Sequence, residues 1–189
     1  FAYPEAGENV LTDISFKAKK GQTIAVIGST GSGKSTLINL IPRYYDVTKG
    51  SVKVDGVDVR DMTQKELRDK LGYVPQKGVL FSGTIDSNIR YGKPEITDAQ
   101  VKEAAEVAQA TEFIDTKPEK YESPVSQGGT NVSGGQKQRL SIARAIAKDP
   151  EIFIFDDSFS ALDFKTDSQL RKALKEYTKD ATTVIVAQR

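Results

Sequence analysis

The sequence predicts an α/β fold built on a parallel sheet whose strands are covered on both faces. Short apolar runs without alternation lie at residues 23–27, 152–155 and 182–187, and strands buried on both faces have this composition. Helical stretches separate these runs, which is the order of parallel strands joined by crossover helices. Alternating sequence near the start and a helix-rich middle add an antiparallel β part and a helical part to the prediction.

Length and composition restrict the chemistry that this fold can carry. A chain of 189 residues suffices for one compact domain that buries about 70% of its unfolded surface. The sequence has no Cys and no His, so disulfides, thiolate nucleophiles, Ser-His mechanisms and His-metal sites are excluded. A formal charge of +1 argues against a dedicated nucleic-acid binder. No apolar run reaches about 18 residues, so no membrane span is predicted within this sequence.

The first expected elements surround a glycine-rich turn. Residues 10–16 alternate apolar and polar side chains and are predicted as a strand. The apolar run 23–27 is the next predicted strand, and the glycine-rich turn follows it directly. A helix is predicted over 34–45, with Pro42 ending or kinking its last part.

A hairpin and a short strand are expected next. Residues 51–59 alternate around Asp55-Gly56, the dipeptide most typical of a two-residue hairpin turn. Residues 72–76 are predicted as a strand that ends before a turn. The hairpin and the strand predicted near the start together form the expected antiparallel β part.

The middle of the chain is predicted to be mainly helical. Thr97 and Gln100 have the spacing of a capping box and begin a predicted helix over 97–110. Residues 123–130 contain Pro and two Gly and are predicted as a loop. A second helix is predicted over 133–148, stopped by the Asp-Pro dipeptide that follows.

The last part of the chain returns to buried strands. Residues 152–155 and 182–187 are the predicted strands, with a helix over 168–177 between them. We therefore expect residues 1–76 and 151–189 to form one core with the antiparallel β part, and residues 77–150 to form a helical subdomain.

Residues 28–36, GSTGSGKST, match the phosphate-binding pattern G-x-x-x-x-G-K-[ST]. Glycines let consecutive backbone N–H groups turn toward phosphate oxygens, and the positive end of the following helix points at the same place. Lys34 brings a cation to the β- and γ-phosphates, and the Ser35 hydroxyl is a ligand for Mg²⁺. A chance match in a chain of this length is on the order of 1%. The predicted phosphate-binding residues are Ser29, Thr30, Gly31, Ser32, Gly33, Lys34, Ser35 and Thr36.

A Mg²⁺-dependent phosphate site also needs a carboxylate. Asp156 and Asp157 follow the buried run 152–155, and ligands of α/β folds bind at the carboxyl ends of parallel strands. The other reading of such a pair is a solvated end of a strand. The phosphate-binding pattern in the same chain favours Asp156 as a metal ligand.

Further motifs in the same order identify a family. Residues 132–139 read VSGGQKQR, residues 160–163 read SALD, and Gln76 follows a predicted strand. With the phosphate loop and the paired aspartates, this order closely resembles the ATP-binding cassette (ABC) ATPase domain over essentially the whole chain. Residues 80–89, LFSGTIDSNI, are similar to the exporter branch of that family.

The resemblance implies a P-loop NTPase core of the RecA-like type that binds ATP and Mg²⁺. Within it, Tyr3 resembles the aromatic residue that stacks on adenine. Gln76 resembles the amide that contacts Mg²⁺ and the attacking water, and it begins the segment that faces a membrane domain. The implied catalytic residues are Lys34, Gln76, Asp157 and Gln188, and the implied metal ligands are Ser35, Gln76 and Asp156.

The resemblance also implies partners. Ser133, Gly134, Gly135 and Gln136 form a capping-box pattern, yet two glycines in a first helical turn cost roughly 0.8–1 kcal/mol each relative to Ala. In the family this segment contacts the γ-phosphate of ATP on a second ABC ATPase domain, in a head-to-tail dimer. The implied setting is the cytoplasmic face of the cell membrane, beside the transmembrane domains of an exporter, with no nucleic acid bound.

Departures from the family pattern lie at two implied catalytic positions and in the loop before the signature, where the family has a charge at the domain-domain contact. Asp157 stands where the family usually has Glu, Gln188 where it usually has His, and Ser126-Gln127 where it usually has Gly-Glu. The first two predict a degenerate site with slow turnover, whose intact signature completes the site of a different partner subunit. A homodimer that tolerates both residues and an engineered inactive variant remain alternatives.

Other nucleotide-binding classes agree less well with the sequence. A soluble ABC ATPase acting on ribosomes or DNA usually has two cassettes or strongly basic segments. A P-loop kinase or GTPase-like switch lacks the signature segment, and a GTPase needs an N-K-x-D sequence that is not present here.

Overall fold

The structure is a computed structural model that describes residues 1–188. Its centre is a parallel sheet of four strands in the order β1-β8-β7-β4. The strands are β1 (Thr23–Ile27), β8 (Thr182–Ala187), β7 (Ile152–Asp156) and β4 (Leu71–Val74). The predicted α/β class is thereby confirmed, and β7 and β8 are largely buried as predicted. The prediction of burial is wrong for β1, which lies at the edge of the sheet and has Ile27 66% exposed.

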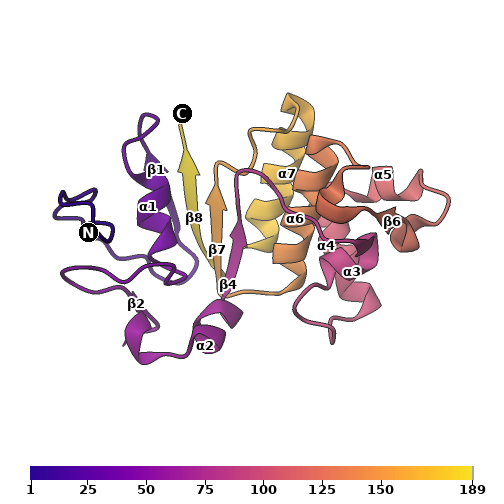
Figure 1. Ribbon diagram of the computed structural model, residues 1–189. Coiled ribbons are helices and arrows are strands. Elements are labelled where there is room, and N and C mark those ends of the chain that lie inside the picture. Colours follow the sequence, from indigo (N-terminus) through magenta and orange to yellow (C-terminus); the bar gives the residue numbers. More distant parts are fainter. Residues whose placement is uncertain (189) are drawn as a thin grey trace.

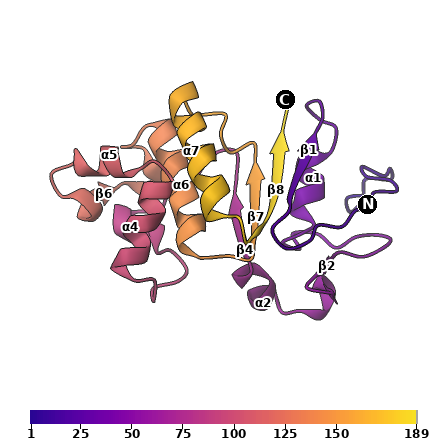
Figure 2. The same ribbon diagram turned by 180° about the vertical axis from the view of Figure 1, so that it is seen from behind.

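Helices cover the two faces of this sheet, as Figure 1 and Figure 2 show from opposite sides. Helix α1 (Lys34–Asn39) places Ile38 on one face, against Ile154 of β7 and Val184 of β8. Helices α6 (Gly134–Ala147) and α7 (Phe164–Tyr177) pack on the other face, where Phe153 and Phe155 of β7 join the larger core. Neighbouring residues of β7 therefore point to opposite layers, which explains why this strand is apolar throughout.

The helical part lies at the far end from β1, beyond α6 (Figure 1). It contains α3 (Ile85–Ile89), α4 (Asp98–Val107) and α5 (Thr111–Asp115), with a short antiparallel pair of β5 (Gly83–Thr84) and β6 (Pro124–Val125). Two 3₁₀ turns, η2 (Lys120–Glu122) and η3 (Gln127–Gly129), lie in the connection to α6. The division into a core and a helical subdomain stays a prediction.

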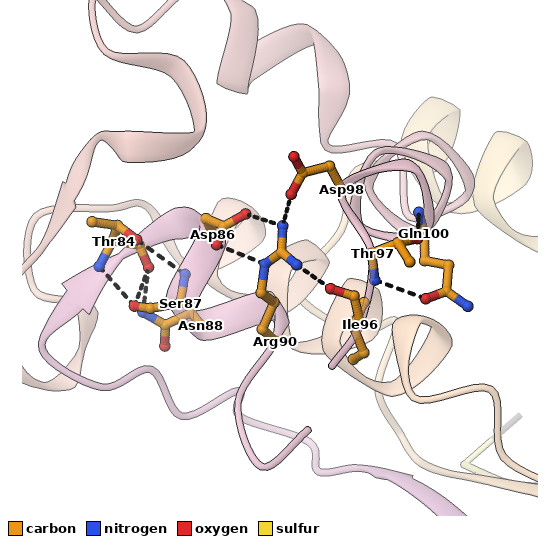
Figure 3. Close-up of polar contacts among 9 residues, drawn as sticks. All are labelled: Thr84, Asp86, Ser87, Asn88, Arg90, Ile96, Thr97, Asp98 and Gln100. Carbon is orange, nitrogen blue, oxygen red and sulfur yellow. Dashed lines mark hydrogen bonds and ion pairs between the residues drawn. The ribbon is translucent and has the colours of Figure 1, made fainter. Parts of the chain in front are cut away.

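Polar contacts tie α3 to the start of α4 (Figure 3). Arg90 at the end of α3 donates to Asp86 at 2.8 Å and also to Asp98 and the Ile96 carbonyl. The predicted capping box at α4 is present, because the Thr97 amide donates to the Gln100 side chain at 2.8 Å and the Gln100 amide donates back to Thr97.

The antiparallel β part is smaller than predicted. β2 (Lys53–Val54) and β3 (Val57–Asp58) form the expected hairpin, and Asp55 and Gly56 both have positive φ, as a type I′ turn requires. The strand predicted over residues 10–16 is not formed. Ile14 and Phe16 are 51% and 50% exposed, and no described strand pairs with this segment. Alternation alone therefore gave a wrong prediction, because a strand needs a hydrogen-bonded neighbour.

Several boundaries and short elements also differ from the predictions. α1 ends at Asn39 rather than near residue 45, and Pro42 follows it within a turn. α7 begins at Phe164 rather than at 168, because the Asp163 carboxylate caps it. The predicted loop 123–130 contains β6 and η3. Helix α2 (Gln64–Asp69), the 3₁₀ turn η1 (Val59–Asp61), α3 and α5 were not predicted.

Candidate functional site

The carboxyl ends of the four parallel strands bring the predicted site residues to one edge of the sheet. Gly28 follows β1, Gln76 follows β4 by two residues, Asp156 ends β7 and Gln188 follows β8. These residues come from segments far apart in the sequence, and only the parallel pairing of the strands places them together. Ligands of open α/β sheets bind at such an edge.

The turn at residues 28–33 requires glycine at particular positions. Gly31 and Gly33 have φ of 79° and 96°, which L side chains rarely adopt. A Cβ on Gly28 would lie 2.8 Å from the Ser32 hydroxyl, and one on Gly33 would lie 3.1 Å from Leu11. The loop therefore holds a compact shape, with Ser29, Thr30, Gly31 and Ser32 all exposed at its surface.

The Lys34 ammonium lies inside the loop. Its Nζ donates to the carbonyl oxygens of Gly28 at 2.5 Å and Ser29 at 2.7 Å. The ammonium thus lies within the curve of the loop, where it adds a full positive charge to the amides of the turn. Such an arrangement attracts an anion with several oxygens, which is the chemistry of a polyphosphate.

A hydroxyl and a carboxylate face each other beside the loop. Ser35 Oγ donates to the two carboxylate oxygens of Asp156 at 3.2 and 3.3 Å. Tyr73 of β4 donates its hydroxyl to Asn39 at 3.1 Å and lies 3.5 Å from Asp156. Burial raises the pKa of Asp156, the Ser35 hydrogen bond opposes this, and the neighbouring Asp157 raises it further. Burial and the charge of Asp156 raise the pKa of Tyr73, which keeps its hydroxyl protonated.

These oxygens suit one particular kind of metal site. Within residues 1–188 no cluster of three or more His, Cys, Asp or Glu side chains is present that could hold a metal ion by itself. Mg²⁺ is usually bound by one or two carboxylates together with water and substrate phosphate oxygens. The Ser35 hydroxyl and the Asp156 carboxylate, next to a phosphate loop, fit that donor set.

The second aspartate has a different surrounding. Asp157 has φ of 49°, in the left-handed region, and its amide donates to the Val186 carbonyl of β8 at 2.9 Å. Its carboxylate accepts a hydrogen bond from the Gln76 side-chain amide at 3.3 Å. The segment after β4 and the end of β7 therefore meet directly at the site.

Gln188 and Tyr3 each contact one residue of the predicted phosphate-binding segment 28–36. The Gln188 amide donates to the Thr30 hydroxyl at 3.2 Å, which brings the end of β8 to the phosphate loop. The Tyr3 hydroxyl shares a hydrogen bond of 2.6 Å with Thr36 in α1. The rings of Phe1 and Tyr45 both pack edge-on against the Tyr3 ring, each with its centroid 5.0 Å from that of Tyr3. The centroids of Phe1 and Tyr45 lie 5.9 Å from each other. An aromatic group therefore stands beside the first turn of α1.

The signature segment lies apart from the phosphate loop. Ser133 caps α6 and forms the predicted capping box with Gln136, whose amide donates to the Ser133 hydroxyl at 3.1 Å. A Cβ on Gly134 would meet no heavy atom within 4 Å, and one on Gly135 would lie 3.6 Å from the Ala161 carbonyl. Among the described residues no hydrogen bond joins this segment to residues 28–36. Packing among residues 1–188 therefore gives no reason for two glycines here.

Some contacts of the site were not predicted from the sequence. Tyr73 lies in an apolar strand, and no sequence signal connects it with Asp156. Gln138 of α6 is 1% exposed and hydrogen-bonds the backbone on both sides of Gln76. The sequence did offer one signal for Gln138, since a polar residue at a core-facing position of a helix needs a buried hydrogen-bond partner.

Comparisons with known proteins give consistent results. A family profile described as ABC transporter matches residues 11–160. The chain is 47% identical over 189 residues to a putative multidrug export ATP-binding/permease protein of Bacillus subtilis. It is 50% identical over 192 aligned residues to an uncharacterized ABC transporter ATP-binding protein of Mycobacterium tuberculosis. Both comparisons cover 100% of this chain and 33% of the relative.

A solved structure agrees with the fold. The structure of a bacterial Atm1-family ABC exporter with ATP bound superimposes with a TM-score of 0.94 at 38% identity, covering 100% of this chain and 33% of the exporter chain. The chain thus spans about a third of the length of the curated relatives that it matches. None of the helices described in residues 1–188 is both long and apolar enough to cross a membrane.

Proposed function

The chain belongs to the ABC transporter family, and from that premise we propose that it is the ATP-binding and ATPase domain of an ABC exporter that powers substrate export across a membrane. One observation carries the proposal. The phosphate loop, Asp156, Asp157 and Gln188 meet at one edge of the sheet, with Ser35 and Asp156 at 3.2 Å and Gln76 and Asp157 at 3.3 Å.

The residues of this edge divide the chemistry of phosphoryl transfer among them. Backbone amides of the loop and the Lys34 ammonium bind the phosphates and offset their negative charge. Ser35 and Asp156 would hold Mg²⁺, with Gln76 beside them, and the ion when bound supplies charge neutralisation at the β- and γ-phosphates. On this proposal Asp157 would orient the attacking water, and Tyr3 would stack on the adenine ring.

A second ABC ATPase domain completes the site on this proposal. The phosphate loop is exposed, and the glycines at the start of α6 have no internal packing reason. Close approach to a ligand explains two glycines in a first helical turn better than stability does. In a head-to-tail pair, the signature segment of each domain would cover the nucleotide held by the other.

The rest of the exporter lies outside this chain on the same proposal. The Bacillus subtilis relative is named as an ATP-binding/permease protein and is about three times as long as the part matched. We therefore assign the chain to the cytoplasmic face of the cell membrane, in contact with transmembrane domains through the segment that follows Gln76. Closure of the two ATPase domains would move that segment and so drive transport.

The site of this chain is proposed to turn over slowly. Asp157 is one methylene shorter than the Glu usual in the family, and a misplacement of about 1 Å can cost about 10²-fold in rate. Gln188 donates a neutral hydrogen bond and cannot carry a proton or a charge, unlike His. From these two substitutions we infer a heterodimer, in which the intact SGGQ segment of this chain completes the faster site of a different subunit. The alternative is a homodimer in which both residues are tolerated.

Steady-state ATP hydrolysis tests this proposal. We expect slow hydrolysis by this chain alone, and faster hydrolysis when it is mixed with an exporter ATPase subunit that carries Glu and His at the two positions. Replacing Gly135 by Asp in this chain should abolish the gain in the mixture, because the added carboxylate would repel the partner's nucleotide. Rapid hydrolysis by this chain alone would overturn the degenerate site and favour the homodimer.

A further inference from the structure

One side chain of α6 holds the backbone on both sides of Gln76. Gln138 Nε2 donates to the Pro75 carbonyl at 2.9 Å, and the Gly78 amide donates to Gln138 Oε1 at 2.7 Å. Gln138 is 1% exposed, so both hydrogen bonds lie away from water. A buried amide that uses its donor and its acceptor on one segment fixes the position of that segment strongly.

The same segment is packed closely along α6. A Cβ on Gly78 would lie 2.6 Å from the Ser141 hydroxyl, so only glycine allows this approach. One helical turn further along α6, the Arg144 guanidinium donates to the Val79 carbonyl at 2.8 Å. Gln138, Ser141 and Arg144 recur every third residue, so they lie on the same side of the helix. The segment 75–79 therefore follows one face of α6.

Gln76 and Lys77 are the two residues between the points held by Gln138. Both side chains are exposed, and the Gln76 amide reaches Asp157 at 3.3 Å, beside Asp156 and Ser35. The backbone that carries Gln76 cannot shift without moving the Pro75 carbonyl or the Gly78 amide. Its position at the nucleotide site is therefore set by α6.

Helix α6, which holds the backbone around Gln76 through Gln138, begins at the signature segment. Gln136 belongs to the capping box at the start of α6, and Gln138 lies two residues further along the same helix. A helix of 14 residues moves largely as a unit, so a displacement at Gln138 reaches its first turn. Gln138 thus connects the phosphate site of this chain to the helix end that would face the nucleotide of the partner.

We propose that Gln138 is a positioning residue that fixes Gln76 at the phosphate site and transmits nucleotide occupancy there to the first turn of the signature helix. The inference rests on the proposed function, because it requires Mg·ATP at the phosphate loop. It adds a named route by which the two composite sites of a dimer influence each other through one chain.

Amide hydrogen exchange tests this connection directly. In the wild-type chain, Mg·ATP should slow exchange at residues 28–36, and it should change exchange of the Gly78 amide and of the Gln136 and Lys137 amides together. In Gln138→Met, a variant of similar size without either hydrogen bond, the change at Gln136 and Lys137 should be lost. Mg·ATP should still protect residues 28–36 in this variant, since Gln138 makes no contact with the loop.

Two further variants separate this role from a general effect on folding. Ser141→Ala lies on the same side of α6 and removes a buried hydroxyl that has no hydrogen-bond partner among the residues that the structure describes. It should therefore respond to Mg·ATP like the wild type. Gln138→Asn keeps the amide chemistry but is too short to reach both backbone groups, and it should weaken the response at Gln136. It decides the question if Gln138→Met does not fold.

The outcomes distinguish this inference from the proposed function. Protection of residues 28–36 in every variant, with an unchanged response at Gln136 and Lys137 in Gln138→Met and Gln138→Asn, overturns the inference alone. No protection of residues 28–36 in the wild type overturns the proposed function and the inference with it.

Discussion

Replacing Asp157 with Glu should accelerate ATP hydrolysis by this chain. The added methylene extends the carboxylate by about 1.5 Å, one carbon–carbon bond. The Asp157 carboxylate now accepts from Gln76 at 3.3 Å, on the side of the site that holds Asp156 and Ser35. Because a misplacement of about 1 Å can cost about 10²-fold in rate, the longer side chain should raise kcat by about 10- to 100-fold.

The same substitution should lower stability. Asp157 has φ of 49°, and Asp adopts the left-handed region more readily than Glu because its short side chain can hydrogen-bond locally. Glu at this position should therefore reduce the free energy of unfolding by about 1 kcal/mol. A faster but less stable variant is the expected combination, and it separates an effect on catalysis from a general improvement of the fold.

Steady-state ATPase assays with Mg²⁺, together with urea unfolding, measure both effects. Asp157→Asn is the matched control, since it keeps the size of the side chain but removes the charge, and it should be no faster than the wild type. Adding Gln188→His to Asp157→Glu should increase kcat further. An unchanged kcat in Asp157→Glu, with unchanged affinity for Mg·ATP, would refute the reasoning about the length of this side chain.

Three further predictions concern the base, the cap of α7 and the packing of β4. Tyr3→Ala should weaken ATP binding about 2- to 12-fold but leave tripolyphosphate binding unchanged, because ring stacking contributes about 0.5–1.5 kcal/mol; calorimetric titration measures both, and equal weakening would contradict stacking. Hydrogen bonds from Thr166 lower the pKa of Asp163, so its stabilising contribution is present above pH 3.8 and is lost as pH falls through the folded-state pKa. Asp163→Asn keeps a capping side chain without the titrating carboxylate, so its free energy of unfolding, measured with urea, should fall less on acidification than that of the wild type. Equal falls in the two proteins would contradict a contribution of the Asp163 carboxylate to the pH dependence. Gly72→Ala would place a Cβ 2.7 Å from the Pro150 ring and should lower the free energy of unfolding by about 1–3 kcal/mol. Thermal unfolding measures this effect, and an unchanged Tm would contradict it.

Sequence patterns predicted the elements whose signals are local and strong. The apolar runs at β1, β7 and β8 all form strands of the sheet, although β1 at its edge is mostly exposed, and the Asp55-Gly56 turn and the Thr97–Gln100 capping box need no distant partner. Residues 10–16 show the limit of such signals, since their alternation resembles a strand but no described strand pairs with them. Thr63 and Glu66 form the same capping box at α2, and its short helix was not predicted.

The site was predictable only in part. Contiguous motifs identify the phosphate loop, because its chemistry requires glycines, a lysine and a hydroxyl at fixed spacing. The contacts of Tyr73 with Asp156 and of Gln138 with Gly78 depend on how β4 and α6 lie against other elements, which no single segment encodes. The roles of the phosphate-loop residues, the paired aspartates, Tyr3, Gln76, Gln188 and the signature residues all remain predictions.

Binding of Mg·ATP to the purified chain tests the central claim most directly. Calorimetric titration should show Mg²⁺-dependent binding of ATP to the wild type, and Lys34→Ala should weaken it by at least about tenfold, because the ammonium no longer offsets the phosphate charge. Absence of Mg²⁺-dependent binding, or equal affinity in Lys34→Ala, would contradict the account.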